Sequence, residues 1–148
     1  MNTLILATLM IATLSMAGCA SVPMASEADD AAGKTFAAPA ADTAGVYIFR
    51  DSFMGKAVKR SVSLDGVVLG NTANKVYFYK SVSPGSHTVS TESEFGNKSV
   101  SFQAAGGHNY FVRQVIEMGV ISAAANVEMV DDAEGEKEVL QCDRAQQQ

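Results

Sequence analysis

The sequence predicts a small all-β protein, an antiparallel sandwich or a partly closed barrel of seven to eight strands, over residues 45–142. Short apolar or alternating runs begin at Gly45 and are separated by turn-forming residues, a pattern typical of antiparallel sheets. Turn dipeptides recur at Asp65-Gly66, Pro84-Gly85 and Gly106-Gly107. A chain of 148 residues has room for one such domain.

The first strands follow directly from this pattern. Residues 46–50 are apolar up to their last position, which indicates a central strand. Residues 58–64 alternate, so that Val62 and Leu64 face a core while the intervening serines face water. Asp65 and Gly66 accept positive φ at little cost, and therefore predict a two-residue hairpin into a strand over 67–69.

The middle strand, 76–82, is rich in aromatic residues, with Phe78 on one face and Tyr77 and Tyr79 on the other. Pro84 and Gly85 suit the two corners of a turn, so the chain is expected to reverse there into a strand over 87–92.

The later strands are expected at 99–104, 109–116 and 124–130. Residues 131–140 mix acidic side chains with one glycine and predict a short helical turn on the outside of the sheets.

Both ends of the domain are expected to be flexible. Residues 20–44 consist mainly of Ala, Ser, Asp, Glu and Pro, with Phe36 as their one aromatic, which predicts a disordered tether with a reach of roughly 25–30 Å. Residues 143–148 are expected to form a disordered tail.

Residues 1–18 are expected to be a cleaved export signal. The apolar run 4–14 is too short to span a bilayer, which needs about 20 residues. It leads into Met16, Ala17, Gly18 and Cys19, which together resemble the lipobox of bacterial lipoproteins. Met16 replaces the usual leucine, and no Lys or Arg precedes the apolar run. The resemblance implies that Cys19 is lipidated and becomes the first residue of the mature chain.

Two further expectations depend on this lipid. Ala20 and Ser21 follow the cysteine where retained lipoproteins carry Asp, which implies the inner leaflet of the outer membrane, with the domain facing the periplasm. Lipidation also leaves Cys142 as a free thiol or an intermolecular bridge. The alternative is an ordinary cleaved signal, with Cys19 as a structural thiol that could pair with Cys142.

Several ordered motifs point to one family. They are Val46-Tyr47-Ile48-Phe49-Arg50, Leu64-Asp65-Gly66 with Gly70, Phe78-Tyr79, Pro84-Gly85-Ser86-His87-Thr88-Val89 and Tyr110-Phe111-Val112-Arg113-Gln114. In combination they resemble the lipoprotein-associated domain of unknown function 2846 of Gram-negative bacteria, over residues 45–140. The resemblance implies a periplasm-facing β-sandwich similar to PEGA-like modules, and it implies no activity.

No enzyme motif is recognisable. The sequence contains neither Gly-x-Ser-x-Gly nor a phosphate-binding glycine loop, so no catalytic residue, cofactor or small-molecule substrate is assigned. His87 and His108 are too few for a zinc site and are expected to bond their neighbouring turns. A ligand- or metal-binding module in which Glu92 or Glu94 joins His87 is the alternative.

Charge excludes one class of partner. The chain has a net charge of −5 and no concentrated basic face, which argues against nucleic acid. The densest basic group is a candidate contact for phosphate or an acidic polymer, provided that the first two strands form a hairpin; a soluble strand face is the alternative. This group comprises Arg50, Lys56, Lys59 and Arg60. The expected function is that of a non-catalytic, membrane-anchored envelope lipoprotein whose sandwich docks an envelope protein or polymer through a strand edge or its loops.

Overall fold

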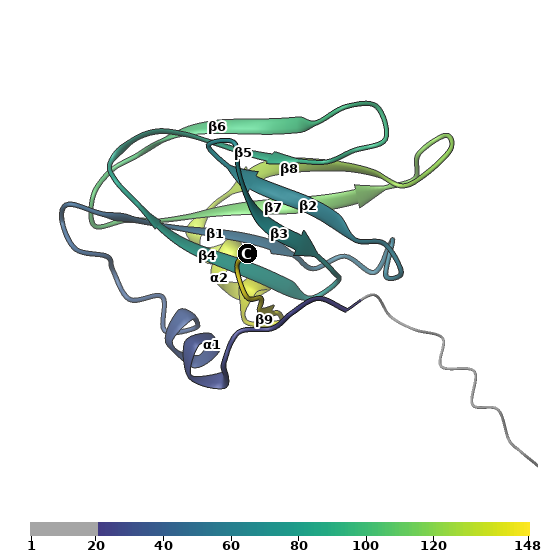
Figure 1. Ribbon diagram of the computed structural model, residues 1–148. Helices are drawn as coiled ribbons and strands as arrows, with labels where there is room; N and C mark the ends of the chain where they lie inside the picture. Colours follow the sequence, from purple (N-terminus) through teal and green to yellow (C-terminus); the bar gives the residue numbers. More distant parts are fainter. Residues whose placement is uncertain (1–20) are drawn as a thin grey trace, which may run out of the picture.

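The computed structural model describes residues 21–148, which form two facing β-sheets and two helices (Figure 1). The elements are α1 (Glu27–Gly33), β1 (Ala44–Arg50), β2 (Arg60–Leu64), β3 (Val67–Thr72), β4 (Val76–Val82), β5 (Gly85–Thr91), β6 (Lys98–Ala104), β7 (Asn109–Glu117), β8 (Ala124–Val130), α2 (Asp132–Val139) and β9 (Asp143–Arg144). Neither helix has the length and apolarity needed to cross a membrane. The lipobox residues Met16, Ala17, Gly18 and Cys19 lie outside the described residues.

The strands confirm an all-β sandwich. One sheet has the order β8-β7-β1-β4-β9 and the other the order β3-β2-β5-β6, so the strands of the described part form two sheets and no closed barrel. The predicted strands 76–82 and 124–130 match β4 and β8, and the helical turn at 131–140 is α2. A purely antiparallel arrangement is wrong, because β1 pairs with β7, and β4 with β9, in parallel.

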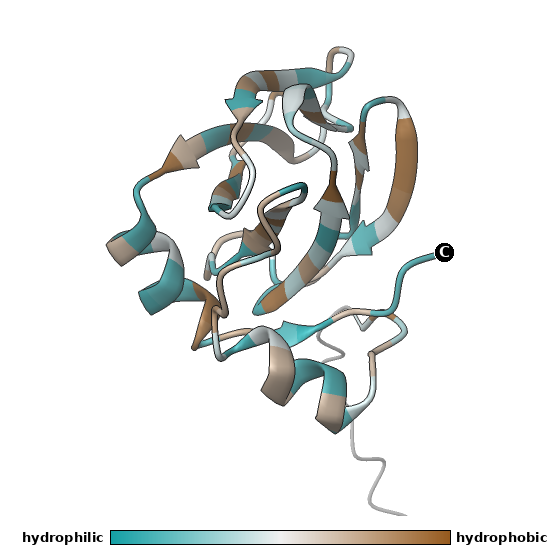
Figure 2. Ribbon diagram, turned by 90° about the vertical axis from the view of Figure 1, so that its left-hand side faces the viewer, coloured by the Kyte–Doolittle hydropathy of each residue, from teal (hydrophilic) through white to brown (hydrophobic). Residues whose placement is uncertain are grey.

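Strand β1 lies in the middle of its sheet, and all its residues are buried. Val46 and Ile48 belong to the core between the two sheets, whereas Tyr47 and Phe49 belong to a second core on the opposite face. The helices lie on that opposite face (Figure 1), and Val139 at the end of α2 contributes to the second core. Figure 2 shows hydrophilic stretches on both helices and hydrophobic ones along the strands. The five-stranded sheet that contains β1 therefore packs against a hydrophobic core on each of its two faces.

The prediction of a flexible tether is wrong for the part that the structure describes. Ser26 caps α1 by accepting a hydrogen bond from the Asp29 amide at 3.1 Å. After the helix, the Phe36 ring lies 5.5 Å from the Tyr47 ring, and the Tyr47 hydroxyl donates to the Gly33 carbonyl at 2.8 Å. A helix cap, aromatic packing and hydrogen bonds to the sandwich thus order a segment whose average composition indicates disorder.

The prediction of a disordered tail is also wrong. Asp143 and Arg144 pair with β4, and Ala145 is buried and forms a bridge with Met24. The Gln148 amide donates to the Leu69 carbonyl at 3.0 Å. The two terminal segments of the described chain thus lie side by side on the sandwich.

Two of the three predicted turns have different outcomes. Asp65 and Gly66, with φ of 51° and 79°, connect β2 and β3 as the expected hairpin. Pro84 and Gly85 do not reverse the chain onto β4, because β4 and β5 belong to different sheets. A Pro-Gly pair specifies a local bend, and here that bend carries the chain from one sheet to the other.

Candidate binding surface at one end of the sandwich

Three loops form one end of the sandwich: 51–59 between β1 and β2, 92–97 between β5 and β6, and 118–123 between β7 and β8 (Figure 1). These loops carry six of the ten large apolar side chains that are exposed in the described chain, with exposed fractions from 49% to 86%. The six are Phe53, Met54, Phe95, Met118, Val120 and Ile121. We call this surface the loop end.

Arg50 fixes the β1–β2 loop from its buried side. Its side chain is fully buried, and its guanidinium donates to the carbonyls of Val58 at 2.7 Å and Gly55 at 2.5 Å. Gly55 has a φ of 74°, and a Cβ there would lie 2.6 Å from Cγ2 of Ile116, so only glycine lets the loop approach β7 this closely. Burial, and then the nearby Arg60, lower the pKa of Arg50 to about 10, which leaves it charged at neutral pH.

Glu94 holds the β7–β8 loop in a comparable way. Its carboxylate accepts hydrogen bonds from the backbone amides of Val120 at 2.7 Å, of Ser122 at 3.0 Å, and of Ile121 between them. Partial desolvation favours a higher pKa for Glu94, but the three amide donors outweigh it and lower the pKa below its ordinary value. The carboxylate is therefore ionised and fixes the backbone at the tip of the loop.

Further polar contacts connect the loops to one another. The Arg60 guanidinium donates to the Ala123 carbonyl at 2.5 Å, and the Ser93 hydroxyl accepts from the Ala125 amide at 2.9 Å. Arg60, Ser93 and Glu94 thus bond inward, whereas the large apolar side chains of these loops are exposed to solvent.

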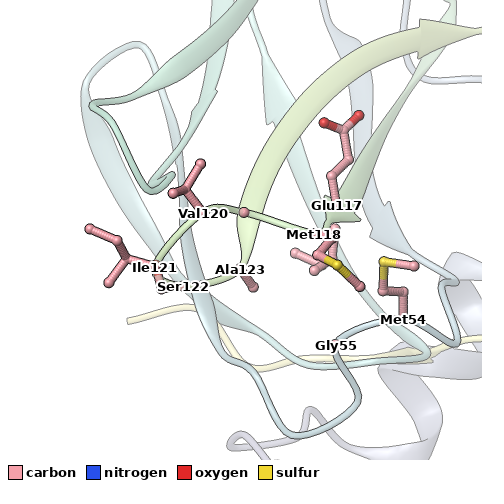
Figure 3. A pocket seen from close by; sticks show the side chains of 10 residues that line it. Met54, Gly55, Glu117, Met118, Val120, Ile121, Ser122 and Ala123 are labelled. Carbon is pink, nitrogen blue, oxygen red and sulfur yellow. The ribbon is translucent and has the colours of Figure 1, made fainter.

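Four of the six apolar residues line a shallow cavity of about 230 Å³: Met54, Met118, Val120 and Ile121. Figure 3 shows Met54 and Met118 beside each other at one side of it, with Val120 and Ile121 near the tip of the β7–β8 loop. Methionine side chains adapt to irregular apolar partners, because they are unbranched and polarisable. The loop end is therefore suited to an apolar partner.

The predicted basic group is not brought together as a surface. β1 and β2 lie in different sheets and do not form a hairpin, and Arg50 is buried. Arg60 is engaged with the Ala123 carbonyl, and the Lys56 ammonium lies 4.3 Å from the centre of the Phe53 ring. Lys59 stands on the same loop. The four residues share one end of the molecule but do not form a single anion-binding patch.

The two histidines lie beside turns and are not brought together with the proposed carboxylates. His87 has Nδ1 2.6 Å from Asp65 Oδ2 and Nε2 2.7 Å from the Ser83 carbonyl. Glu92 lies five residues further along, roughly 17 Å away in an extended chain, and Glu94 is engaged with the β7–β8 loop. Residues 21–148 contain no group of three His, Cys, Asp or Glu side chains that could hold a metal ion.

Arg113 is a structural residue that sequence reasoning did not single out as such. Its guanidinium binds Glu128 at 2.9 Å, Glu134 at 2.7 Å and Glu138 at 2.6 Å. Burial opposes its charge, but the three glutamates outweigh it and raise the pKa of Arg113 above its ordinary value. This cluster attaches α2 to the five-stranded sheet.

Cys142 is a buried free thiol. Its Sγ lies 3.4 Å from the Glu138 carbonyl, and burial raises the pKa of the thiol to about 12. A protonated, buried sulfur is a poor nucleophile, so the intermolecular bridge expected as one alternative would require the fold to open.

The comparisons with known proteins agree with the sequence motifs. The profile of a family described as "Protein of unknown function (DUF2846)" matches residues 40–127. The chain belongs to this family. The DUF2846 match includes β1 and all three loops of the loop end.

A relative in Haemophilus influenzae shares 41% identity over 132 residues, which cover 89% of this chain and 79% of the relative, and is described only as an "Uncharacterized protein". No solved structure matches the chain.

Sequence reasoning missed the loop end, although a signal was present. Segments that connect predicted strands are normally polar, but here they contain Phe53, Met118 and Ile121. Several large apolar residues in separate loops are informative only when the fold places those loops at the same end.

Proposed function

We propose that this chain is a non-enzymatic lipoprotein of the cell envelope, anchored through Cys19, whose β-sandwich acts as a binding module through the loop end. The anchor is supported by the lipobox-like sequence at Cys19. The binding role is supported by one observation, the gathering of six exposed apolar side chains on loops that inward polar bonds hold in place.

An exposed apolar cluster of this kind favours an interaction role. Monomeric soluble proteins rarely expose large contiguous apolar patches, and those that they do expose often mark contact surfaces. Loops that are already ordered lose little conformational entropy on binding, which increases affinity for a given contact area. The most prominent polar clusters of the described chain, around His87, Glu94 and Arg113, are engaged in bonds within the fold.

Mass measurement, labelling and substitution of each of the two cysteines test the anchor. The intact mass of the native protein should correspond to residues 19–148 plus acyl chains, and metabolic labelling with palmitate should mark it. Cys19→Ser should abolish both the label and the processing, whereas Cys142→Ser, as the matched control, should retain them. Equal processing and envelope sedimentation of Cys19→Ser and the native protein would overturn the proposed anchor.

A further inference from the structure

The described chain begins beside the loop end. Val22 and Pro23 line a cavity together with Lys59, which belongs to the β1–β2 loop. The segment is fixed there, because the Ala25 amide donates to the Arg144 carbonyl at 2.9 Å and Met24 forms a bridge with Ala145. Figure 1 shows the first described residues on the same side of the sandwich as the β1–β2 and β7–β8 loops.

This position leaves little chain between the body of the protein and the proposed anchor. Cys19 precedes Val22 by three residues, and three residues span at most about 11 Å when fully extended. On the proposed function, in which Cys19 carries lipid, the side of the sandwich that holds Val22 must therefore lie close to the membrane surface. The long tether expected from composition would have imposed no such orientation.

We propose that the loop end contacts the lipid bilayer directly, with the exposed side chains of the β1–β2 and β7–β8 loops inserted at the boundary between headgroups and acyl chains. The occupant of this apolar surface is thus a phospholipid membrane, and the lipid on Cys19 and the loop end form one composite attachment. Shallow insertion of apolar and aromatic side chains is the usual mode of interfacial membrane binding.

The backbone at the loop tip is suited to such an environment. The amides of Val120, Ile121 and Ser122 are satisfied by Glu94 and so need no water. An amide that lost its water without such a partner would oppose transfer to a low-dielectric environment.

The charges at this end are compatible with a headgroup layer. Lys56 and Lys59 stand on the β1–β2 loop, within reach of lipid phosphates. Four acidic residues lie at this end. Asp51 is paired with Lys75 at 2.7 Å, and Glu94 accepts hydrogen bonds from backbone amides. Glu92 and Glu117 lie where their loops meet the strands. Apolar insertion, more than charge, carries the contact.

Tryptophan substitution tests the contact, because the chain contains no tryptophan. Full-length lipidated Phe53→Trp and Ile121→Trp are reconstituted into vesicles of phosphatidylcholine and phosphatidylglycerol. Val67→Trp is the matched control, since Val67 is also exposed but lies at the opposite end of the β2–β3 hairpin. All three sites are at least 66% exposed, so none of these changes disturbs a core.

The emission of Trp at positions 53 and 121 should shift to shorter wavelength on reconstitution and be largely quenched by lipids with brominated acyl chains, while Trp at position 67 should remain solvent-like. Failure of the protein to float with vesicles would overturn both the anchor and the contact. Flotation with solvent-like, unquenched loop tryptophans would overturn the contact alone. A blue shift without bromine quenching would assign the loop end to a protein or to a second copy of this chain. Equal quenching at position 67 would exclude an oriented contact. Either result overturns the proposal.

Discussion

His87, on β5, faces two hydrogen-bond acceptors, one from Asp65 in the β2–β3 turn and one from Ser83 between β4 and β5. Nδ1 faces the Asp65 carboxylate at 2.6 Å and Nε2 faces the Ser83 carbonyl at 2.7 Å, so only the doubly protonated imidazolium satisfies both. The bond from Asp65 raises the pKa of His87, burial opposes it, and Ser83 adds to the rise. Burial favours a higher pKa for Asp65, but the bonds from His87 and the Thr88 amide outweigh it and lower that pKa.

This pair should make stability depend on pH. The contribution from His87 is complete below its ordinary pKa of 6.5 and is lost as pH rises through its raised value in the fold. The contribution from Asp65 is complete above 3.8 and is lost as pH falls through its lowered value. Asp65→Asn should therefore destabilise the protein more at about pH 5.5 than at about pH 8.5. The loss of unfolding free energy should differ by roughly 1 kcal/mol between the two pH values, a small difference because solvent screens the partly exposed Asp65.

Urea unfolding of both proteins at the two pH values measures this difference. Asp42→Asn, a change at an exposed acid, is the matched control and should show no such dependence. The same gap between native and Asp65→Asn proteins at both pH values would contradict the assignment of His87 as charged.

The loops of the loop end depend on single charged residues. Glu94 belongs to the β5–β6 loop but fixes the β7–β8 loop, so the order of one loop is controlled from another. The nearby Glu92 makes only one long side-chain bond, to the Ser61 hydroxyl at 3.4 Å. The pair therefore offers an internal comparison.

Glu94→Ala should release the tip of the β7–β8 loop without unfolding the sandwich. We expect hydrogen exchange at Val120, Ile121 and Ser122 to become faster by on the order of tenfold, because local opening no longer breaks three bonds. Glu92→Ala should leave exchange at these amides unchanged. Unaltered exchange in Glu94→Ala would show that other contacts hold the loop.

Strand positions were predictable because alternation and turn dipeptides are local signals. The sequence pattern placed β4 and β8 and the Asp65-Gly66 turn correctly. Partner strands were not predictable: nothing local indicates that Gly45 lies beside Asn109 in parallel, or that Pro84 leads into another sheet.

Helix α1 had a local signal, Ser26 with Asp29 three positions later, but composition concealed it. The loop end depends on partner strands, which is why its apolar residues could not be recognised as one surface. Arg50 was expected in an exposed basic group, and its burial became evident only when β1 lay between β4 and β7.

The last six residues join both β3 and β4 to the first described segment of the chain. The Asp143 and Ala145 amides donate to the carbonyls of Lys75 and Tyr77, at and beside β4. The Gln148 amide donates to the Leu69 carbonyl on β3. Two further bonds connect this segment to the first described residues, from Gln146 to Pro23 and from Ala25 to Arg144. The C-terminal segment thus holds the N-terminal one.

Deletion of residues 143–148 should destabilise the protein by roughly 3–5 kcal/mol, at about 1 kcal/mol for each backbone hydrogen bond. Thermal unfolding followed by circular dichroism should show a clearly lower Tm. Deletion of residues 146–148 alone keeps β9 and Ala145, and should lower the Tm less. Equal Tm values for the native protein and the longer deletion would show that the tail adds nothing to the fold.

The bridge between Met24 and Ala145 has a consequence for the order of folding. It joins segments from opposite ends of the described chain, and contacts between residues far apart in sequence form slowly because the entropy of loop closure opposes them. The join between the two terminal segments is therefore expected to be among the last contacts to form.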